Sequence, residues 1–225
     1  MSKAIAELIG TFVFVLFAVS AIAFGGASGL ELALTVAFVL VAATVLVTGL
    51  SGAHLNPAVT LGSVVSGRTA LPDAVQYWIA QFIGAIAAVF VVWLVAQVAD
   101  VEPASYGGNV VGGLDVAGTF IVEALIVAFF VLVYLKVTES ESSLVGRAVT
   151  IGITFGAVYL VVGAATGGSA NMAKSVGAAI FEAGDTDALA DLWLFVVAGA
   201  VGAVLGALAH LTLRGQAADR ETISS

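Results

Sequence analysis

Long apolar runs separated by short polar stretches recur from one end of this chain to the other. Six of the runs are long enough to cross a hydrocarbon core, which takes about 20 mostly apolar residues in a helix. They cover residues 4–24, 32–50, 73–98, 116–138, 147–165 and 188–213. Because such runs continue to the C-terminus, the first one predicts a membrane span and not a cleaved signal peptide.

Two further apolar runs, residues 56–66 and 171–181, are too short to cross a bilayer. At a helical rise of about 1.5 Å per residue each is about 16 Å long, half of a hydrocarbon core about 30 Å thick. Polar turns precede both runs, and non-helical backbone at membrane depth is tolerated only where protein covers it or a water-filled cavity adjoins it. The two runs therefore predict re-entrant half-helices beside a pore.

The composition supports an integral membrane protein. Hydrophobic residues make up 61% of the 225 positions and charged residues only 10%, whereas a soluble domain has about 25% charged residues. The chain has no cysteine and two histidines, which excludes thiol chemistry and leaves little for a metal site. With no nucleophile motif or cofactor loop, we expect no enzyme activity, no cofactor and no metal. The net charge of −8 argues against a nucleic-acid partner.

The positions of the basic residues predict the orientation. If the N-terminus is placed in the cytoplasm, six basic residues fall on the inner side and only Lys174 lies in the outer half. Those six are Lys3, Arg68, Lys136, Arg147, Arg214 and Arg220. This distribution follows the positive-inside rule, so we expect a multi-pass protein of the cell membrane with both termini cytoplasmic.

The chain contains an internal repeat at an offset of 115 residues, which aligns Gly52 with Gly167 and Asn56 with Asn171. We expect one channel domain over residues 1–225, with repeats at about 1–98 and 116–213. Each repeat holds three spans and one half-helix, and because three is odd the repeats enter the membrane in opposite directions. The predicted fold is therefore an all-α membrane protein with six transmembrane helices and two re-entrant half-helices in an inverted repeat.

The half-helices should meet near the bilayer midplane, with Asn56 and Asn171 at their N-termini. A helix N-terminus carries unpaired N–H groups and roughly half a positive charge, so two of them repel cations and protons. Each Asn amide can donate to the oxygen of a passing water. A water held in this way interrupts the hydrogen-bonded chain along which protons would move.

Three further polar residues are expected to brace the loops that lead into the half-helices. Glu7 and Glu123 lie inside predicted spans, where a carboxylate is costly unless it is paired. We expect both to accept hydrogen bonds from backbone donors near the half-helices. We expect the His54 ring to support the first turn and its carbonyl to face the water. A proton relay through the two glutamates is the alternative, and it would suit an ion-coupled transporter.

The two motifs Asn56-Pro57-Ala58 and Asn171-Met172-Ala173 give the chain a resemblance to the aquaporin and glycerol-facilitator family. The resemblance extends from the segment Ala6 to Phe12 to the sixth span. It implies a homotetramer with one pore per subunit. The second motif departs from the family pattern, because Met172 replaces a proline that suits the first helical turn. We expect the half-helix to persist with a slightly different aperture.

The resemblance also locates a selectivity filter by spacing, at Val36, Tyr159, Gly168 and Lys174. The family usually has an aromatic residue at the first position and arginine at the last. Lys174 keeps the positive charge without the planar fork of arginine, so we expect cation exclusion with looser geometry. Val36 opens one wall and Tyr159 adds bulk to another. Ser175 stands where glycerol-conducting members usually carry Asp, which favours water.

The sequence therefore predicts a passive channel for water, with small neutral solutes as further candidates, that excludes protons and ions within the lipid bilayer. A glycerol or polyol facilitator is the nearest alternative. An ion-coupled secondary transporter is a second alternative, and a structural membrane protein with a blocked pore is a third.

Overall fold

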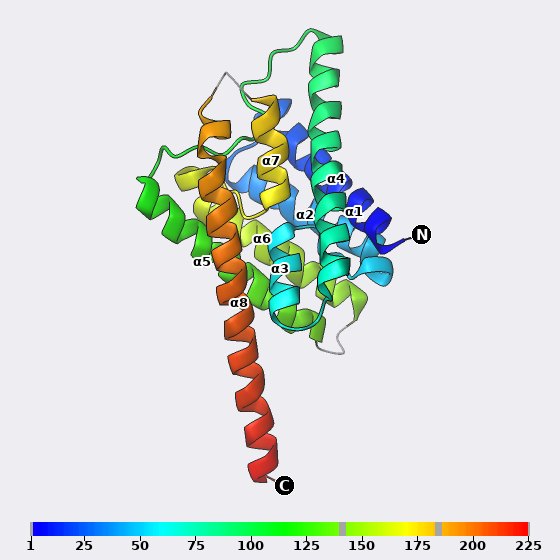
Figure 1. The fold of residues 1–225 in the computed structure, drawn as a ribbon. Coiled ribbons are helices and arrows are strands. Elements are labelled where there is room, and N and C mark those ends of the chain that lie inside the picture. Colours follow the sequence, from blue (N-terminus) through cyan, green and yellow to red (C-terminus); the bar gives the residue numbers. More distant parts are fainter. Residues whose placement is uncertain (1, 140–142, 183–185, 225) are drawn as a thin grey trace.

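In the computed structural model, which describes residues 2–139, 143–182 and 186–224, every described regular element is a helix. Six helices are long and apolar enough to cross a membrane. They are α1 (Lys3–Ala23), α2 (Gly29–Ser51), α4 (Leu71–Ala99), α5 (Val116–Glu139), α6 (Leu144–Thr166) and α8 (Ala188–Ser224). The predicted spans are thus confirmed, and α8 continues beyond the bundle toward the C-terminus (Figure 1).

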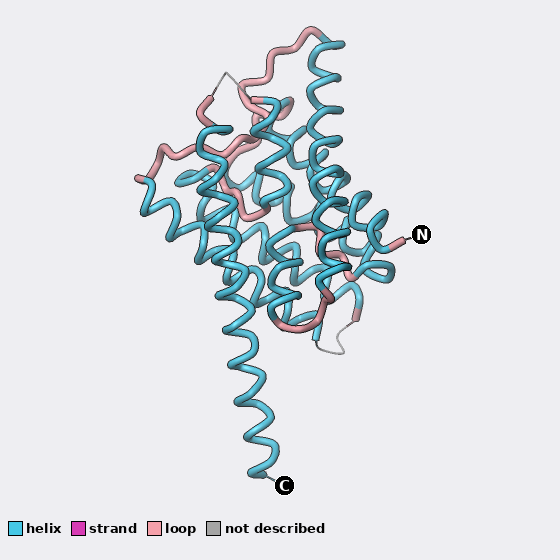
Figure 2. The backbone as a smooth tube through the Cα atoms, viewed as in Figure 1, coloured by secondary structure: helices cyan, strands magenta, loops and turns pink. Residues whose placement is uncertain are grey.

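Two short helices, α3 (Pro57–Val65) and α7 (Met172–Phe181), occupy the middle of the bundle (Figure 1). Figure 2 shows loop backbone running into the interior at the start of each, whereas the other loops lie at the two ends of the bundle. The long helices before them, α2 and α6, are followed by the C-cap residues Gly52 and Gly167, both in the left-handed conformation with φ of 91° and 74°. Glycine adopts that conformation without strain, so each chain can turn back toward the membrane centre.

The packing of the helices repeats between the two halves. Helix α1 packs on α4 and α5 packs on α8, while α2 lies along α6 between the halves. Helix α7 of the second half packs on α4, and α3 of the first half packs on α8. The close α1–α4 approach depends on Gly84, since a Cβ atom there would lie 2.5 Å from the carbonyl oxygen of Leu8. Helices in lipid associate through such small residues.

The outward sides of the long helices carry large apolar side chains, among them Phe17, Phe38 and Val161. Lipid is as apolar as these side chains, so their exposure fits a membrane-embedded surface. Polar side chains such as Asn56, Gln81 and Asn171 are instead buried at the centre. We call the face where α1 begins the inner face, and the opposite one the outer face.

Candidate functional site

Asn56 and Asn171 cap the two half-helices and are linked to each other's loops. The Asn56 side-chain oxygen accepts from the backbone N–H of Ala58 at 2.9 Å, and that of Asn171 accepts from Ala173 at 3.0 Å. The Nδ2 of Asn56 donates to the carbonyl of Ala170 at 2.7 Å. The Nδ2 of Asn171 donates to the carbonyl of Leu55 at 2.9 Å. An amide nitrogen carries two hydrogens, so each Asn has a second one left to donate to a pore water.

The loops before the half-helices hold these carbonyls in place through unusual backbone conformations. Ala53, Leu55 and Ala170 have positive φ values of 57°, 51° and 44°. Non-glycine residues adopt this conformation only when surrounding contacts impose it. Here the reciprocal Asn bonds and two buried glutamates supply those contacts.

Glu7 braces the first loop from α1. Its Oε1 accepts from the Ser51 hydroxyl at 2.6 Å and the His54 N–H at 2.9 Å. Its Oε2 accepts from the Leu55 N–H and from Gln81 Nε2, both at 2.7 Å. Gln81 on α4 was not singled out from the sequence, although a glutamine inside a long apolar run was a visible signal.

Glu123 braces the second loop from α5 in the corresponding way. Its carboxylate accepts from the Thr166 hydroxyl and, at 3.3 Å each, from the N–H groups of Ser169 and Ala170. These donors lie at the 115-residue offset from Ser51, His54 and Leu55. The two halves thus share three hydrogen bonds to the glutamate, with longer backbone contacts in the second, while Glu7 alone also accepts from a glutamine.

The ring of His54 is a structural partner of the first half-helix. Its Nδ1 lies 3.1 Å from the Thr60 hydroxyl, and the rings of Tyr77 and Tyr134 pack edge-on against it at centroid distances of 5.1 and 5.7 Å. Burial, followed by the positive charge of Arg68, lowers the pKa of His54 to about 3. The imidazole is therefore neutral in the physiological range, since protonation would need a pH near that value.

The first residues of the two half-helices differ in their surroundings. Pro57 begins α3, and its carbonyl accepts from Trp78 Nε1 at 3.1 Å. Met172 begins α7 and is buried, with its Cγ 3.0 Å from where a Cβ of Gly199 would lie. The flexible thioether side chain thus fills space over α8, and α7 forms without the proline.

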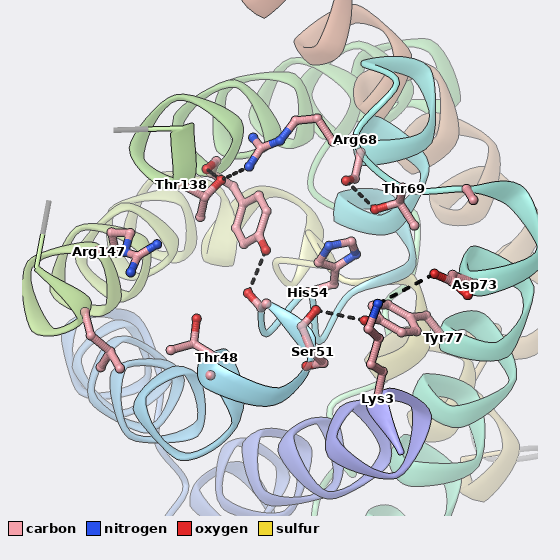
Figure 3. Close-up of a pocket in the computed structure, with 16 residues that line it drawn as sticks. Lys3, Thr48, Ser51, His54, Arg68, Thr69, Asp73, Tyr77, Thr138 and Arg147 are labelled. Carbon is pink, nitrogen blue, oxygen red and sulfur yellow. Dashed lines mark hydrogen bonds and ion pairs between the residues drawn. The ribbon is translucent and has the colours of Figure 1, made fainter. Parts of the chain in front are cut away.

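A vestibule of about 330 Å³ opens at the inner face and leads to His54 (Figure 3). Beyond His54 the space contracts to a cavity of about 10 Å³ for the centre of a water-sized sphere, roughly the room for one water molecule. Asn56 and Asn171 both line this narrow cavity, together with Leu40, Ile151 and Phe155. The geometry therefore places the two amides beside a one-water constriction.

Phe155 is a pore-lining residue that the sequence reasoning missed. Its ring packs edge-on against Phe130 and Phe14, at centroid distances of 4.9 and 5.4 Å. Tyr159, one turn further along α6, lies 5.1 Å from it. Because a residue four positions before a filter position lies on the same helix face, the helical period was the signal that could have found it.

The four positions predicted to form the filter are all buried. Gly168 closely approaches Tyr159, since a Cβ atom at Gly168 would lie 3.1 Å from the tyrosine ring. The Tyr159 hydroxyl donates to the carbonyl of Ser169 at 3.4 Å, a weak contact. Val36 is fully buried on α2, the helix that lies along α6.

Lys174 is directed into the α4–α5 loop, where its ammonium is bonded. Its Nζ donates to the Gly107 carbonyl at 2.6 Å and lies 3.5 Å from Asn109 Oδ1. Glu182 fixes the same loop by accepting from the Ser105 hydroxyl and the Tyr106 N–H. Burial lowers the pKa of Lys174 to about 8, and the charges of Glu182 and Glu123 partly oppose that shift. Sequence spacing could not reveal Gly107 and Asn109, because they belong to an irregular loop.

Comparisons with known proteins agree with this architecture. The family model described as "Major intrinsic protein" matches residues 1–210. A protein named Aquaporin Z from Brucella melitensis is 36% identical, over 96% of this chain and 99% of its own length. Glycerol uptake facilitator protein-like 6 from Lactiplantibacillus plantarum is 34% identical, over 92% of this chain and 95% of its own.

Among solved structures, the aquaglyceroporin from Plasmodium falciparum aligns with a TM-score of 0.81 at 22% identity. The alignment covers 92% of this chain and 93% of that one, which confirms the aquaporin fold. Six spans, two central half-helices and a family model that matches nearly the whole chain lead to one conclusion: the chain belongs to the major intrinsic protein family of membrane channels.

Proposed function

We propose that this protein is a passive water channel that excludes protons and other ions. The observation that carries the proposal is the pair of Asn amides beside a cavity of about 10 Å³. A water in this cavity accepts from the free amide hydrogens of Asn56 and Asn171 and turns its own hydrogens away from them. The half-helix N-termini add positive potential at the same point.

The outer constriction contributes a second barrier to cations in this proposal. Val36, Tyr159 and Gly168 set its width, and Lys174 provides the positive charge. Because the ammonium is bonded to Gly107, its position is held by the loop and does not depend on a free lysine side chain. Pro57, Ala58, Met172 and Ala173 shape the pore centre, while Glu7, Glu123 and His54 keep its loops in place.

We further propose a homotetramer in the cell membrane, with both termini cytoplasmic and no catalytic activity. The orientation is supported by the basic residues gathered at the inner face, among them Lys3, Arg68 and Arg147. Each subunit is one domain, with repeats at about 1–98 and 116–213, and contains its own pore.

Small neutral solutes such as glycerol are a second candidate cargo. The observation that favours them is a relative 34% identical to this chain that is named a glycerol uptake facilitator-like protein. Phe155 and Tyr159 add an aromatic wall along which the carbon side of a polyol can slide. The narrow cavity beside the Asn pair favours water.

The test is stopped-flow light scattering on proteoliposomes. We expect shrinkage several-fold faster than in empty liposomes after a challenge with an impermeant osmolyte. Shrinkage at the empty-liposome rate would refute the water channel. Rapid re-swelling in glycerol would establish the facilitator, and solute uptake driven by a pH gradient would establish a coupled transporter.

A further inference from the structure

The inner vestibule carries an excess of positive charge. Its lining includes Lys3, Arg68 and Arg147, and Asp73 is the single acidic residue among the described lining residues. The chain as a whole has a net charge of −8, so this concentration of cations opposes the overall balance. The cavity of about 330 Å³ also falls within the size range of small-molecule sites.

Two of the cations have identified partners that leave their charge available. Lys3 Nζ lies 3.8 Å from Asp73 Oδ2, and both side chains are about half exposed or more, so this ion pair is weak. Arg68 donates to the carbonyl of Leu135 at 2.8 Å and to the Thr138 hydroxyl at 2.9 Å. Both acceptors are neutral, and they fix the guanidinium without cancelling its charge.

The Arg147 side chain has no hydrogen-bond or ion-pair partner among the described residues, and its Nε is shielded from solvent. A buried donor without an acceptor is destabilising. Figure 3 shows the side chain reaching from the start of α6 into the cavity, toward the side where Thr138 and Arg68 lie. Arg147 and Arg68 both line the vestibule, so the two side chains border the same cavity.

Other titratable groups near the inner face do not cancel the excess positive charge of the vestibule. Glu139 at the end of α5 pairs with Lys136 and Arg214. His54 at the floor of the vestibule is neutral, and Glu141 lies outside the described residues. The described vestibule therefore presents two guanidinium groups, one of them unpaired, to whatever enters from the inner side.

We propose that the inner vestibule binds a small oxyanion of the phosphate class, either inorganic phosphate or a phosphate monoester, between Arg147 and Arg68. A guanidinium donates two parallel N–H bonds to such an oxyanion. The bound anion lies between the inner surface and His54 and therefore obstructs the water path. This obstruction rests on the proposed water-channel function, whereas the binding does not.

The flux experiment compares water permeability with and without phosphate on both sides of the proteoliposomes, at ionic strength matched with chloride. The ratio of the two permeabilities is taken for each protein, so that a change in basal flux cancels. The control is Lys136→Gln, a basic residue near the same face whose exposed side chain pairs with Glu139. We expect phosphate to slow wild type and Lys136→Gln several-fold. Arg147→Gln should need about ten times more phosphate, since it loses a charge-assisted bond.

A thermal-shift experiment in a maltoside detergent, which contains no phosphate, measures binding without flux. Phosphate should raise the melting temperature of wild type above that in chloride, and Arg147→Gln should lose this shift. Arg147→Lys keeps the charge but loses the planar guanidinium, so it should show an intermediate shift. It replaces Arg147→Gln as the test variant if Arg147→Gln folds poorly. Equal phosphate responses in wild type and Arg147→Gln, or no response in wild type, would overturn the site. A protein that conducts no water but shows the shift would refute only the channel.

Discussion

Replacing Glu7 by glutamine tests whether buried carboxylates hold the loops that position the Asn pair. The substitution keeps the size of the side chain and turns one acceptor oxygen into an NH₂ group. In the native protein Oε2 accepts from the Leu55 N–H and from Gln81 Nε2, both at 2.7 Å. An NH₂ group at this position faces two donors and can accept from neither.

The magnitude follows from the number of bonds lost. A hydrogen bond to a charged group contributes about 1.5–3 kcal/mol, so two lost bonds predict a destabilisation of about 3–6 kcal/mol. One backbone N–H still loses its acceptor if the Gln81 amide turns to accept from the new NH₂, or if the NH₂ takes the Oε1 position and donates to the Ser51 hydroxyl. The cost then falls to about 1.5–3 kcal/mol. For a chain of this length each kcal/mol corresponds to about 2–4 °C in melting temperature.

Glu123→Gln is the internal comparison, because Glu123 does the same task in the other half. Glutamine there can keep its oxygen toward Thr166 and Ser169, and it gives up the contact with the Ala170 N–H at 3.3 Å. We therefore expect a smaller cost, about 1–3 kcal/mol. Glu31→Gln is the surface control, since Glu31 is exposed at the start of α2.

The assay is thermal unfolding of the three purified variants in one detergent, followed by water flux in proteoliposomes for those that stay folded. The expected order of destabilisation is Glu7→Gln, then Glu123→Gln, then Glu31→Gln near zero. A Glu7→Gln protein that melts within about 3 °C of Glu31→Gln would refute the bracing role.

Two further predictions concern the pore. Phe155→Ala should widen the narrow cavity and raise glycerol permeability several-fold in a re-swelling assay. Phe129→Ala, which changes a lipid-facing side chain, is the control. An unchanged glycerol permeability in Phe155→Ala would show that Phe155 does not form part of the pore wall. Lys174, whose pKa burial lowers to about 8, loses its charge as the pH rises through that value, so sodium leak should increase between pH 7 and 9. Lys174→Arg stays charged and should show a flat profile; a flat wild-type profile would contradict the proposed charge barrier.

The Asn pair shows how much of the site can be predicted from the sequence. The 115-residue offset, the two short apolar runs and the Asn at the start of each predict the half-helices, and the structure caps each helix with that Asn. The offset also relates Ser51 to Thr166 and Leu55 to Ala170, which are bonded to equivalent glutamates. Local pattern was sufficient here because helix starts and lengths in lipid follow from nearby residues.

The sequence did not predict the roles of three residues, Gln81, Phe155 and Arg147. Gln81 acquires its role from Glu7 on another helix, and Phe155 acquires its place in the wall from packing against Phe14 and Phe130. From the sequence, Arg147 is only one of the basic residues predicted to lie on the inner side of the membrane. Contacts between distant segments decide such roles, because a side chain's rotamer and partners depend on what the fold brings beside it.

By itself the sequence determined six spans, two half-helices, their inverted relation and the two Asn that meet between them. These features follow from apolar length, small turn residues and the requirement that backbone groups in lipid be satisfied within the protein. Tertiary structure alone decided the width of the narrow cavity at Phe155 and the attachment of Lys174 to the Gly107 carbonyl. It also decided that the Arg147 side chain has no partner among the described residues. Those depend on how close two helices and an irregular loop come, which is set by packing across the whole bundle and not by any one segment.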